Sequence, residues 1–223
     1  MNILPISDIH GKDEILYWII DNINPELYDL VTVSGDLWEG GSLDKREVWV
    51  EFQKQINKPI VMILGNHDYT DASVFDDVDN IHLLHNESIE IDGVLFYGTP
   101  YTVRFCNWNW MSSEEELYEA WSKGIPDKLD VLLSHGPPHG YCDNCNQPVY
   151  GNTVDSTIGS ASLRKVIEEK DIKYVFCGHI HTGDRVRAME CGTKVYNVSC
   201  VDESYKFGGH NPTPSVVKLE LGD

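Results

Sequence analysis

Carboxylate, amide and imidazole side chains follow short apolar segments at five places in this sequence of 223 residues. In chain order these side chains are Asp8, His10, Asp36, Asn66, His67, Asp68, His135, His179 and His181. Such apolar segments are typical of buried strands, and ligands of α/β proteins gather at the carboxyl edge of the sheet. Oxygen and imidazole ligands together suit divalent metal ions. The pattern therefore predicts a metal centre at one sheet edge.

The segment Gly65-Asn66-His67-Asp68 is the most specific of the five. At about 5% usage for each residue, it is expected roughly once in 10⁵ positions. Each of the other places has an ordinary explanation when taken alone; Gly35-Asp36, for example, is a common turn. Five of the nine histidines follow strand-like segments, however, whereas core histidines are normally scattered. We therefore interpret the five places jointly.

Strands and helices alternate in the first part of the chain. The strand-like segments are 2–6, 30–33 and 60–64, and the segments with helical apolar spacing are 13–23 and 43–56. This order predicts parallel strand pairing. If the chain stays extended beyond the first strand, Asp8 and His10 point to the same side and can chelate one ion.

The second part of the chain begins with an antiparallel hairpin, because residues 88–91 and 94–97 alternate in polarity around the tight-turn sequence Asp92-Gly93. The strand and helix alternation then resumes. Helices are expected over 114–121 and 162–169, and strands over 131–134, 174–177, 195–198 and 216–221. The sequence predicts a mixed α/β architecture, with two sheets and outer helices, in one domain spanning residues 1–223.

The stretch 136–159 is long and rich in turn residues. Loops of this length usually have a function, so one interpretation is a wall or lid over a site beside His135. The other interpretation is a surface excursion without fixed structure. The stretch contains Cys142 and Cys145, which are either a structural zinc pair or loop cysteines without a special role.

Net charge and hydropathy disfavour several function classes. The 17 Lys and Arg residues against 36 Asp and Glu give a net charge of −19, which repels nucleic acid and anionic lipid. No apolar run approaches the ~20 residues of a membrane span, and the N-terminus lacks a signal-peptide pattern. Six scattered cysteines in such a chain are typical of reduced thiols. We expect a cytoplasmic protein without membrane or nucleic-acid partners.

The order Asp-x-His, Gly-Asp, Gly-Asn-His-Asp, a lone His and Gly-His-x-His resembles the calcineurin-like metallophosphoesterase superfamily, from Asp8 to His181. The segments Ser-His-Gly-Pro-Pro at 134–138 and Gly-Thr-Pro-Tyr at 98–101, with Trp-Asn-Trp at 108–110, resemble the brain-type metallophosphoesterase-domain proteins and their microbial relatives. The resemblance implies a four-layer α/β/β/α sandwich of two mixed sheets with flanking helices.

The resemblance also implies a role for each ligand-type residue. One ion is held by Asp8, His10 and His181, and the other by Asn66, His135 and His179. Asp36 bridges both ions, His67 faces the substrate, and Asp68 orients His67 from behind.

These roles agree with the chemistry of two-metal sites. Two divalent ions about 3.5–4 Å apart share a water, lower its pKa and direct the hydroxide at phosphorus in line with the leaving oxygen. Three oxygen ligands and four imidazoles suit Mn, Fe, Zn, Co or Ni, with Mn²⁺ favoured here, whereas Mg or Ca prefers nearly all oxygen. His67 can stabilise the transition state or protonate the leaving group.

The substrate is less clearly indicated. Asp36 is followed by Leu37-Trp38, without the Asp-Arg-Gly that resembles the phosphoprotein phosphatases, which favours a diester or a small nucleotide. Arg104 is a candidate substitute for the missing phosphate contact. Trp38, His139 and Tyr141 either line the pocket, where they could stack on a nucleobase, or serve packing.

The leading hypothesis is a metal-dependent phosphodiesterase that acts on a small or cyclic nucleotide. Alternatives within enzymes are a phosphomonoesterase, a phosphoprotein phosphatase or a nuclease. An alternative of another class is a non-catalytic protein-binding scaffold of the same fold, although such a protein is expected to have lost ligands, and none is lost here.

Overall fold

Two packed β-sheets form the centre of the protein. The structure, a computed structural model, describes residues 1–39, 46–145, 157–209 and 213–221. The first sheet has the order β13-β1-β2-β3-β4, with the strands Val217–Lys218, Asn2–Ile6, Leu30–Ser34, Ile60–Ile63 and Ile81–Leu83. Strands β1 to β4 are parallel, and β13 pairs antiparallel with β1.

The second sheet has the order β11-β12-β10-β9-β6-β5. Its strands are, in that order, Val186–Ala188, Lys194–Asn197, Asp171–Cys177, Lys128–Ser134, Val94–Thr99 and Glu87–Ile91. The four inner strands are parallel, whereas β5 and β11 pair antiparallel at the edges. A separate two-stranded ladder joins β7 (Thr102–Val103) to β8 (Met111–Ser112).

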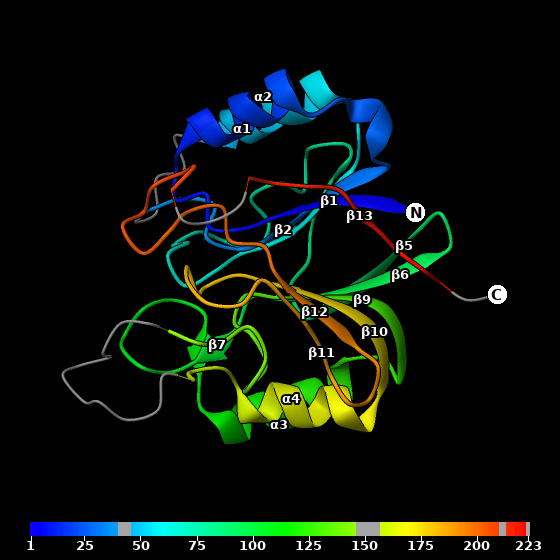
Figure 1. The fold of residues 1–223 in the computed structure, drawn as a ribbon, viewed down its shortest axis with the longest axis vertical. Coiled ribbons are helices and arrows are strands. Elements are labelled where there is room, and N and C mark those ends of the chain that lie inside the picture. The colour runs from blue at the N-terminus through cyan, green and yellow to red at the C-terminus, as the bar shows by residue number, and fades with distance from the viewer. Residues whose placement is uncertain (40–45, 146–156, 210–212, 222–223) are drawn as a thin grey trace.

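Helices cover the outer face of each sheet (Figure 1). Helices α1 (Asp13–Asn22) and α2 (Arg46–Ile56) lie over the first sheet, and a 3₁₀ turn, Pro25–Leu27, follows α1. Helices α3 (Glu114–Gly124) and α4 (Ala161–Glu169) lie over the second sheet. The order of helices, sheet, sheet and helices confirms the predicted four-layer α/β/β/α sandwich.

Alternating side chains fill the space between the layers. In β1, Leu4 packs with the residues of α1 and α2, whereas Ile3 packs between the two sheets. In β10, Phe176 packs between the sheets and Val175 packs with α3 and α4. Each such burial contributes about 1.5–3 kcal/mol, so the strands are held firmly and their ends have fixed positions.

Most predicted elements are confirmed within a few residues. The pairing of Ile91 with Val94 confirms the hairpin. The strand expected over 216–221 is limited to Val217–Lys218, and the first residues of the helix expected over 43–56 lie outside the described residues. The sequence pattern does not predict β4, β7, β8 or β11, because two or three residues are too few to show a period.

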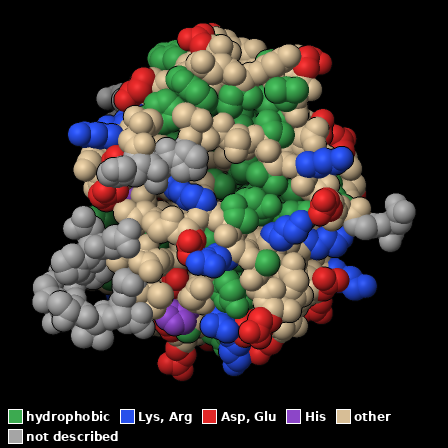
Figure 2. Space-filling model, viewed as in Figure 1, with side chains coloured by type: hydrophobic (Ala, Val, Ile, Leu, Met, Phe, Trp, Pro, Cys, Tyr) green, Lys and Arg blue, Asp and Glu red, His purple; other side chains and the backbone are tan. Residues whose placement is uncertain are grey.

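The described surface carries both signs of charge. Figure 2 shows acidic and basic side chains over the upper and the lower half of one face. None of the helices within the described residues is long and apolar enough to cross a membrane. The expectation that nucleic acid is not a partner stays a prediction.

Candidate metal centre and active site

The carboxyl ends of strands from both sheets meet at one place. Strands β1, β2 and β3 are neighbours in the first sheet, and β9 and β10 are neighbours in the second. Ser34, at the end of β2, donates a hydrogen bond from Oγ to the carbonyl oxygen of Phe176 in β10 at 3.0 Å. A bridge between Ser7 and Ser199 joins the sheets again. These links bring together the residues that follow all five strands.

Left-handed turns aim four of these side chains into the centre. The φ angles of Asp8, His10, Asp36 and His179 are 54°, 49°, 51° and 66°. This conformation costs a non-glycine residue roughly 1–2 kcal/mol, and such strain is typical of functional sites. The chain after β1 is therefore not extended. Asp8 and His10 approach each other through a turn, and the expected strand alternation does not bring them together.

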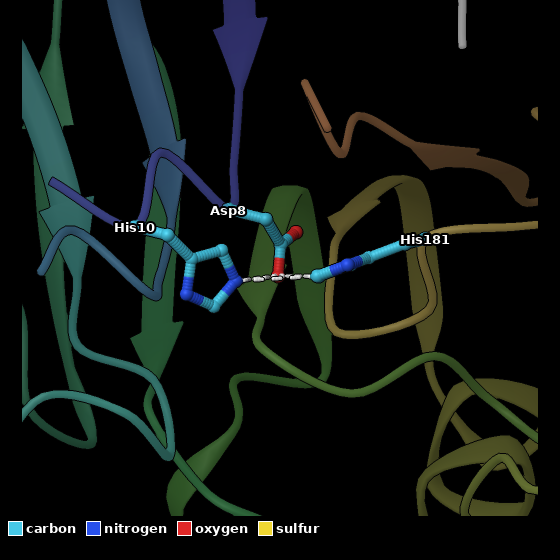
Figure 3. A group of neighbouring side chains, drawn as sticks. All are labelled: Asp8, His10 and His181. Atoms are coloured by element: carbon cyan, nitrogen blue, oxygen red, sulfur yellow. Dashed lines mark hydrogen bonds and ion pairs between the residues drawn. The ribbon is translucent and has the colours of Figure 1, made fainter. Parts of the chain in front are cut away.

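Asp8, His10 and His181 form a first group of converging side chains (Figure 3). Asp8 Oδ1 lies 3.1 Å from His181 Nε2 and 3.9 Å from His10 Nε2. The Nε2 atoms of His10 and His181 are 3.3 Å apart. One carboxylate oxygen and two imidazole nitrogens, all within 4.8 Å of one another, can hold a metal ion.

Asn66, His135 and His179 lie where the second ion is expected. His135 Nδ1 lies 2.9 Å from the carbonyl oxygen of Ser34. A carbonyl oxygen only accepts, so Nδ1 carries the proton and Nε2 of the neutral ring presents a lone pair. His135 Nε2 lies 2.8 Å from Asn66 Oδ1, and the rings of His135 and His179 have centroids 5.1 Å apart.

Asp36 stands between the two groups. Its Oδ2 lies 3.6 Å from His10 Nε2, and its Oδ1 lies 3.4 Å from His135 Nε2. The residue is 1% exposed, so water does not screen its charge. A carboxylate that faces one histidine of each group is placed as a bridging ligand requires.

Buried polar atoms without partners mark the same place. Among the described residues, His10 Nδ1 and Asn66 Nδ2 are buried and have no hydrogen-bond partner, which costs about 1–3 kcal/mol for each group. When His135 is neutral, the lone pairs of Asn66 Oδ1, His135 Nε2 and the Asp36 carboxylate face one another, and they repel unless a proton or a metal ion lies among them. The residues present therefore fit divalent metal ions.

Both carboxylates of the centre are ionised at neutral pH. Burial opposes ionisation of Asp8, but His181, His135 and His10 outweigh it and hold the pKa of Asp8 well below its ordinary value. Burial also opposes ionisation of Asp36, whose pKa is nevertheless lowered to about 2, chiefly by His135. The anions are the forms that bind metal.

The histidines differ in protonation. Burial lowers the pKa of His10 to about 4 and that of His179 to about 3, so both rings are neutral at pH 7. Burial acts in the same direction on His135, but Asp36 and Asp8 outweigh it and raise the pKa of His135 to about 9. A metal ion that binds His135 Nε2 must displace this proton.

His67 faces a cavity in front of the centre. Its ring lies edge-on to the rings of His10 and Trp108, at centroid distances of 4.8 Å and 4.3 Å. Its backbone amide donates to Asp36 Oδ1 at 2.8 Å. This position suits a substrate-facing residue. A nitrogen of His67 also lies within 4.8 Å of ligand atoms of His10 and Asp36, so the geometry also suits a metal ligand.

Asp68 braces the loops that carry the centre. Its carboxylate accepts backbone amides of Leu37, Trp38 and Gly65 at 3.2, 2.9 and 2.8 Å. Burial and the neighbouring Asp36 raise the pKa of this carboxyl to about 7, against the effect of the three amides. None of these contacts is with the His67 ring. The orientation of His67 by Asp68 therefore stays a prediction, and the contacts that the structure shows would act through the backbone of the turn.

The cavity has a volume of about 310 Å³ and is lined by Asp36, His67, His179 and His181, among others. The four predicted substrate-binding residues are absent from its described lining; these are Trp38, Arg104, His139 and Tyr141. Their role in substrate binding therefore stays a prediction.

Trp38 is a core residue. It is 1% exposed and stacks on Phe75 with ring centroids 6.1 Å apart. The left-handed turn at Asp36 directs the carboxylate into the centre. The next side chains, Leu37 and Trp38, pack in the core between the first sheet and its helices. Proximity to a ligand in sequence therefore does not predict a place in the cavity.

The other three residues have partners elsewhere. Arg104 donates from Nη2 to the carbonyl oxygen of Met111, across the β7–β8 loop. Tyr141 packs against a guanidinium group of α4, and His139 Nδ1 lies 3.6 Å from a carboxylate oxygen of Asp143. These contacts hold loops in place and leave the cavity to other side chains.

The cavity is lined by three aromatic residues outside the predicted substrate-binding set: Phe105, Trp108 and Tyr205. The Trp-Asn-Trp segment was a usable signal for Trp108, but no sequence signal marks Tyr205. Cys145 and Ile158, from the described parts of the stretch 136–159, also line the cavity and form part of its wall. Residues 146–156 of that stretch lie outside the described residues.

Two glycines allow the ligand-bearing turns to approach one another. A Cβ atom at Gly65 would lie 2.3 Å from Asp36 Oδ1, and one at Gly178 would lie 2.2 Å from Asp8 Oδ2. Both distances are far below van der Waals contact. Neither position therefore accepts a larger residue unless a candidate metal ligand moves.

Comparisons with solved structures support the fold. A dimetal phosphatase from Danio rerio superposes with a TM-score of 0.61 at 12% identity, covering 98% of this chain and 92% of that one. The protein TT1561 of Thermus thermophilus superposes with a TM-score of 0.62 at 14% identity, covering 88% of each chain. At these identities the similarity establishes the fold alone.

Sequence comparisons identify relatives of several lengths. The uncharacterized protein MJ1162 of Methanocaldococcus jannaschii is 26% identical, over 92% of this chain and 89% of that protein. The UPF0046 protein K07C11.7 of Caenorhabditis elegans is 26% identical, over 81% of this chain and 63% of that protein. Human metallophosphoesterase domain-containing protein 1 is 29% identical, over 57% of this chain and 37% of that protein. The chain thus spans less than two thirds of the length of the latter two.

The family model of the calcineurin-like phosphoesterases matches residues 1–183. This range includes every residue of the candidate centre, and members of the family use dinuclear centres of divalent metal ions. The chain therefore belongs to the calcineurin-like phosphoesterase family.

Proposed function

We propose that this protein hydrolyses phosphate esters with two divalent metal ions, and that its substrates are diesters of small or cyclic nucleotides. The observation that carries the proposal is the position of Asp36 between two groups of ligand-type side chains, with a histidine of each group 3.4 to 3.6 Å from its oxygens. The Danio rerio structure of the same fold is described as a dimetal phosphatase, which agrees with phosphate-ester hydrolysis.

The side chains divide into those that hold the ions and those that face the substrate. Asp8, His10 and His181 would hold one ion, and Asn66, His135 and His179 would hold the other. Two divalent ions held there would supply a water of lowered pKa and positive charge for the phosphoryl oxygens. The oxygen and imidazole ligands form a borderline set that suits Mn, Fe, Zn, Co or Ni, and of these we propose Mn²⁺.

His67 stabilises the reacting phosphoryl group. Its ring lines the cavity, and its amide contact with Asp36 fixes its distance from the centre. A protonated ring donates a hydrogen bond to a phosphoryl oxygen or a proton to the leaving alkoxide. Asp68 supports this function by holding the turn that carries His67.

The charge of the cavity favours a diester. The described lining contains no Lys or Arg residue, and Arg104 lies outside it. A phosphate monoester carries a second negative charge, and no Lys or Arg of the described lining could balance it, whereas a diester carries one. The six cysteines are free, which supports a reducing compartment such as the cytoplasm.

Hydrolysis of bis(p-nitrophenyl) phosphate and p-nitrophenyl phosphate by Mn²⁺-loaded protein tests the proposal. We expect kcat/KM to be higher for the diester and to be lost in Asn66→Ala. A higher value for the monoester would favour the phosphomonoesterase or phosphoprotein phosphatase. If neither ester nor a panel of nucleotides is hydrolysed, the non-catalytic scaffold becomes the better description.

A further inference from the structure

Three aromatic rings line the cavity, and each packs on a different histidine of the site. The Tyr205 ring lies 4.7 Å from the His10 ring and 5.0 Å from the His181 ring, centroid to centroid. The Phe105 ring lies 5.5 Å from the His179 ring. Trp108, which packs on His67 at 4.3 Å, also contacts Phe105 at 5.6 Å. We call Phe105, Trp108 and Tyr205 the aromatic collar.

The loop that carries Phe105 and Trp108 is fixed to the centre. The carbonyl oxygen of Asp68 accepts hydrogen bonds from Asn109 Nδ2 and Trp110 Nε1, both at 2.9 Å. The Asn109 amide also donates to the carbonyl oxygen of Asn66 at 3.3 Å. The indole of Trp108 is therefore held against the same segment that presents His67.

A second loop holds Tyr205 in place. The Asp202 carboxylate accepts the backbone amides of Ser204 and Lys206, both at 2.9 Å, and the Tyr205 amide donates to the Asp202 carbonyl oxygen at 2.8 Å. Tyr205 has a φ of 57°, a left-handed conformation that is strained for a tyrosine. Strain of this kind is typical of residues whose position serves a ligand.

The collar is apolar, and two of its three rings are exposed. Phe105 and Trp108 are each 42% exposed although they line a concave site, which is typical of a surface that a ligand covers. The charged residue of the described lining outside the centre is Glu203. Within the described lining, the collar therefore offers ring faces to a ligand and no Lys or Arg for an added negative charge.

We propose that the aromatic collar binds an uncharged aromatic ester group of the substrate and discriminates against ester groups that carry a further anionic charge. The proposal rests on the proposed function in one respect, because it takes the ester phosphate to lie at the metal centre. Stacking on Trp108 and Tyr205 provides the affinity, and the cost of burying an added charge against apolar ring faces provides the discrimination.

Binding of slowly reacting diesters tests the collar directly. Diphenyl, diethyl and bis(4-carboxyphenyl) phosphate are titrated into Mn²⁺-loaded protein by calorimetry. Stacking of aromatic groups on protein rings leads us to expect that diphenyl phosphate binds at least about tenfold more tightly than diethyl phosphate. The carboxylated diester is expected to lose most of this advantage. Equal dissociation constants for the three diesters would overturn the proposal.

Variants assign the effect to the collar. In Trp108→Ala and Tyr205→Gly the ratio of diethyl to diphenyl dissociation constants is expected to fall toward one. Glycine at position 205 keeps the left-handed conformation without strain, so this variant is expected to fold. Tyr205→Phe keeps the ring and should keep the ratio. Tyr17→Ala, which removes a 52% exposed ring on α1, is the matched control. A ratio that persists in both Trp108→Ala and Tyr205→Gly would overturn the proposal.

The binding and hydrolysis measurements separate the two proposals. If the diphenyl preference is present but no phosphate ester is hydrolysed, the collar is supported and the proposed function fails. If bis(p-nitrophenyl) phosphate is hydrolysed but the three diesters bind equally, the proposed function is supported and the collar fails.

Discussion

His67 donates its backbone amide to Asp36 Oδ1 at 2.8 Å, although 31 residues separate the two in the chain. The contact ties the candidate bridging carboxylate to the residue that faces the substrate. A shift of one therefore moves the other, so the metal centre and the phosphate-binding side of the cavity form one unit.

We expect Asp36→Asn to impair binding of both ions. The side chain faces a histidine of each group, and the substitution removes its charge while keeping its size. The loss of activity should exceed the roughly 10–100-fold typical of an outer-shell partner. The number of metal ions bound per chain, measured by mass spectrometry, and kcat/KM together check this prediction. Two ions retained per chain would contradict the bridging role.

We expect His67→Ala to lower kcat by about 10²–10³-fold, as loss of one preorganised donor does, with two ions still bound. The same metal analysis decides between the two geometric possibilities for His67. A variant that retains one ion instead of two would show that His67 is a ligand, as its proximity to His10 and Asp36 allows.

We expect Asp68→Ala to destabilise the fold. The substitution leaves three buried backbone amides without their acceptor, which should lower the free energy of unfolding by about 3 kcal/mol. Urea denaturation of the metal-free protein measures the change. Asp68→Asn keeps one oxygen acceptor and should lose less. If both variants have the free energy of unfolding of the wild type, the carboxylate does not stabilise the turns.

We expect Gly65→Ala to weaken metal binding although glycine offers no ligand atom. The added Cβ would lie 2.3 Å from Asp36 Oδ1 and 2.6 Å from His135 Cε1, so both side chains must move. The loss of bound metal in a folded variant, verified by circular dichroism, is the expected result. Full metal content would show that the two turns separate easily.

Metal affinity should rise with pH. His135 has a pKa of about 9 in the metal-free protein, so below that pH a metal ion must displace its proton. The apparent association constant should therefore rise by about tenfold per pH unit from 6.5 toward 9 and level off above 9. Titration of metal-free protein with Mn²⁺ at several pH values measures it. A flat profile would mean that no proton is displaced.

Tertiary structure decided which aromatic side chains line the cavity and which pack in the core. Trp38 and Tyr141 follow ligand-bearing segments in sequence, yet Trp38 is buried against Phe75 and neither lines the cavity. Tyr205 lies on a turn with no motif and still packs on two candidate ligands. The direction of a side chain after a left-handed turn depends on the turn's own hydrogen bonds, which residue types do not reveal.

The sequence by itself determined the family, the sandwich fold and the identity of the candidate ligands, because each ligand directly follows a buried apolar strand and strand ends share a sheet edge. Only the tertiary structure decided that Asp36 lies between the two groups, that Asp68 holds backbone amides, and that an aromatic collar surrounds the cavity. Those features depend on contacts between segments far apart in the chain, and local periodicity carries no information about such contacts.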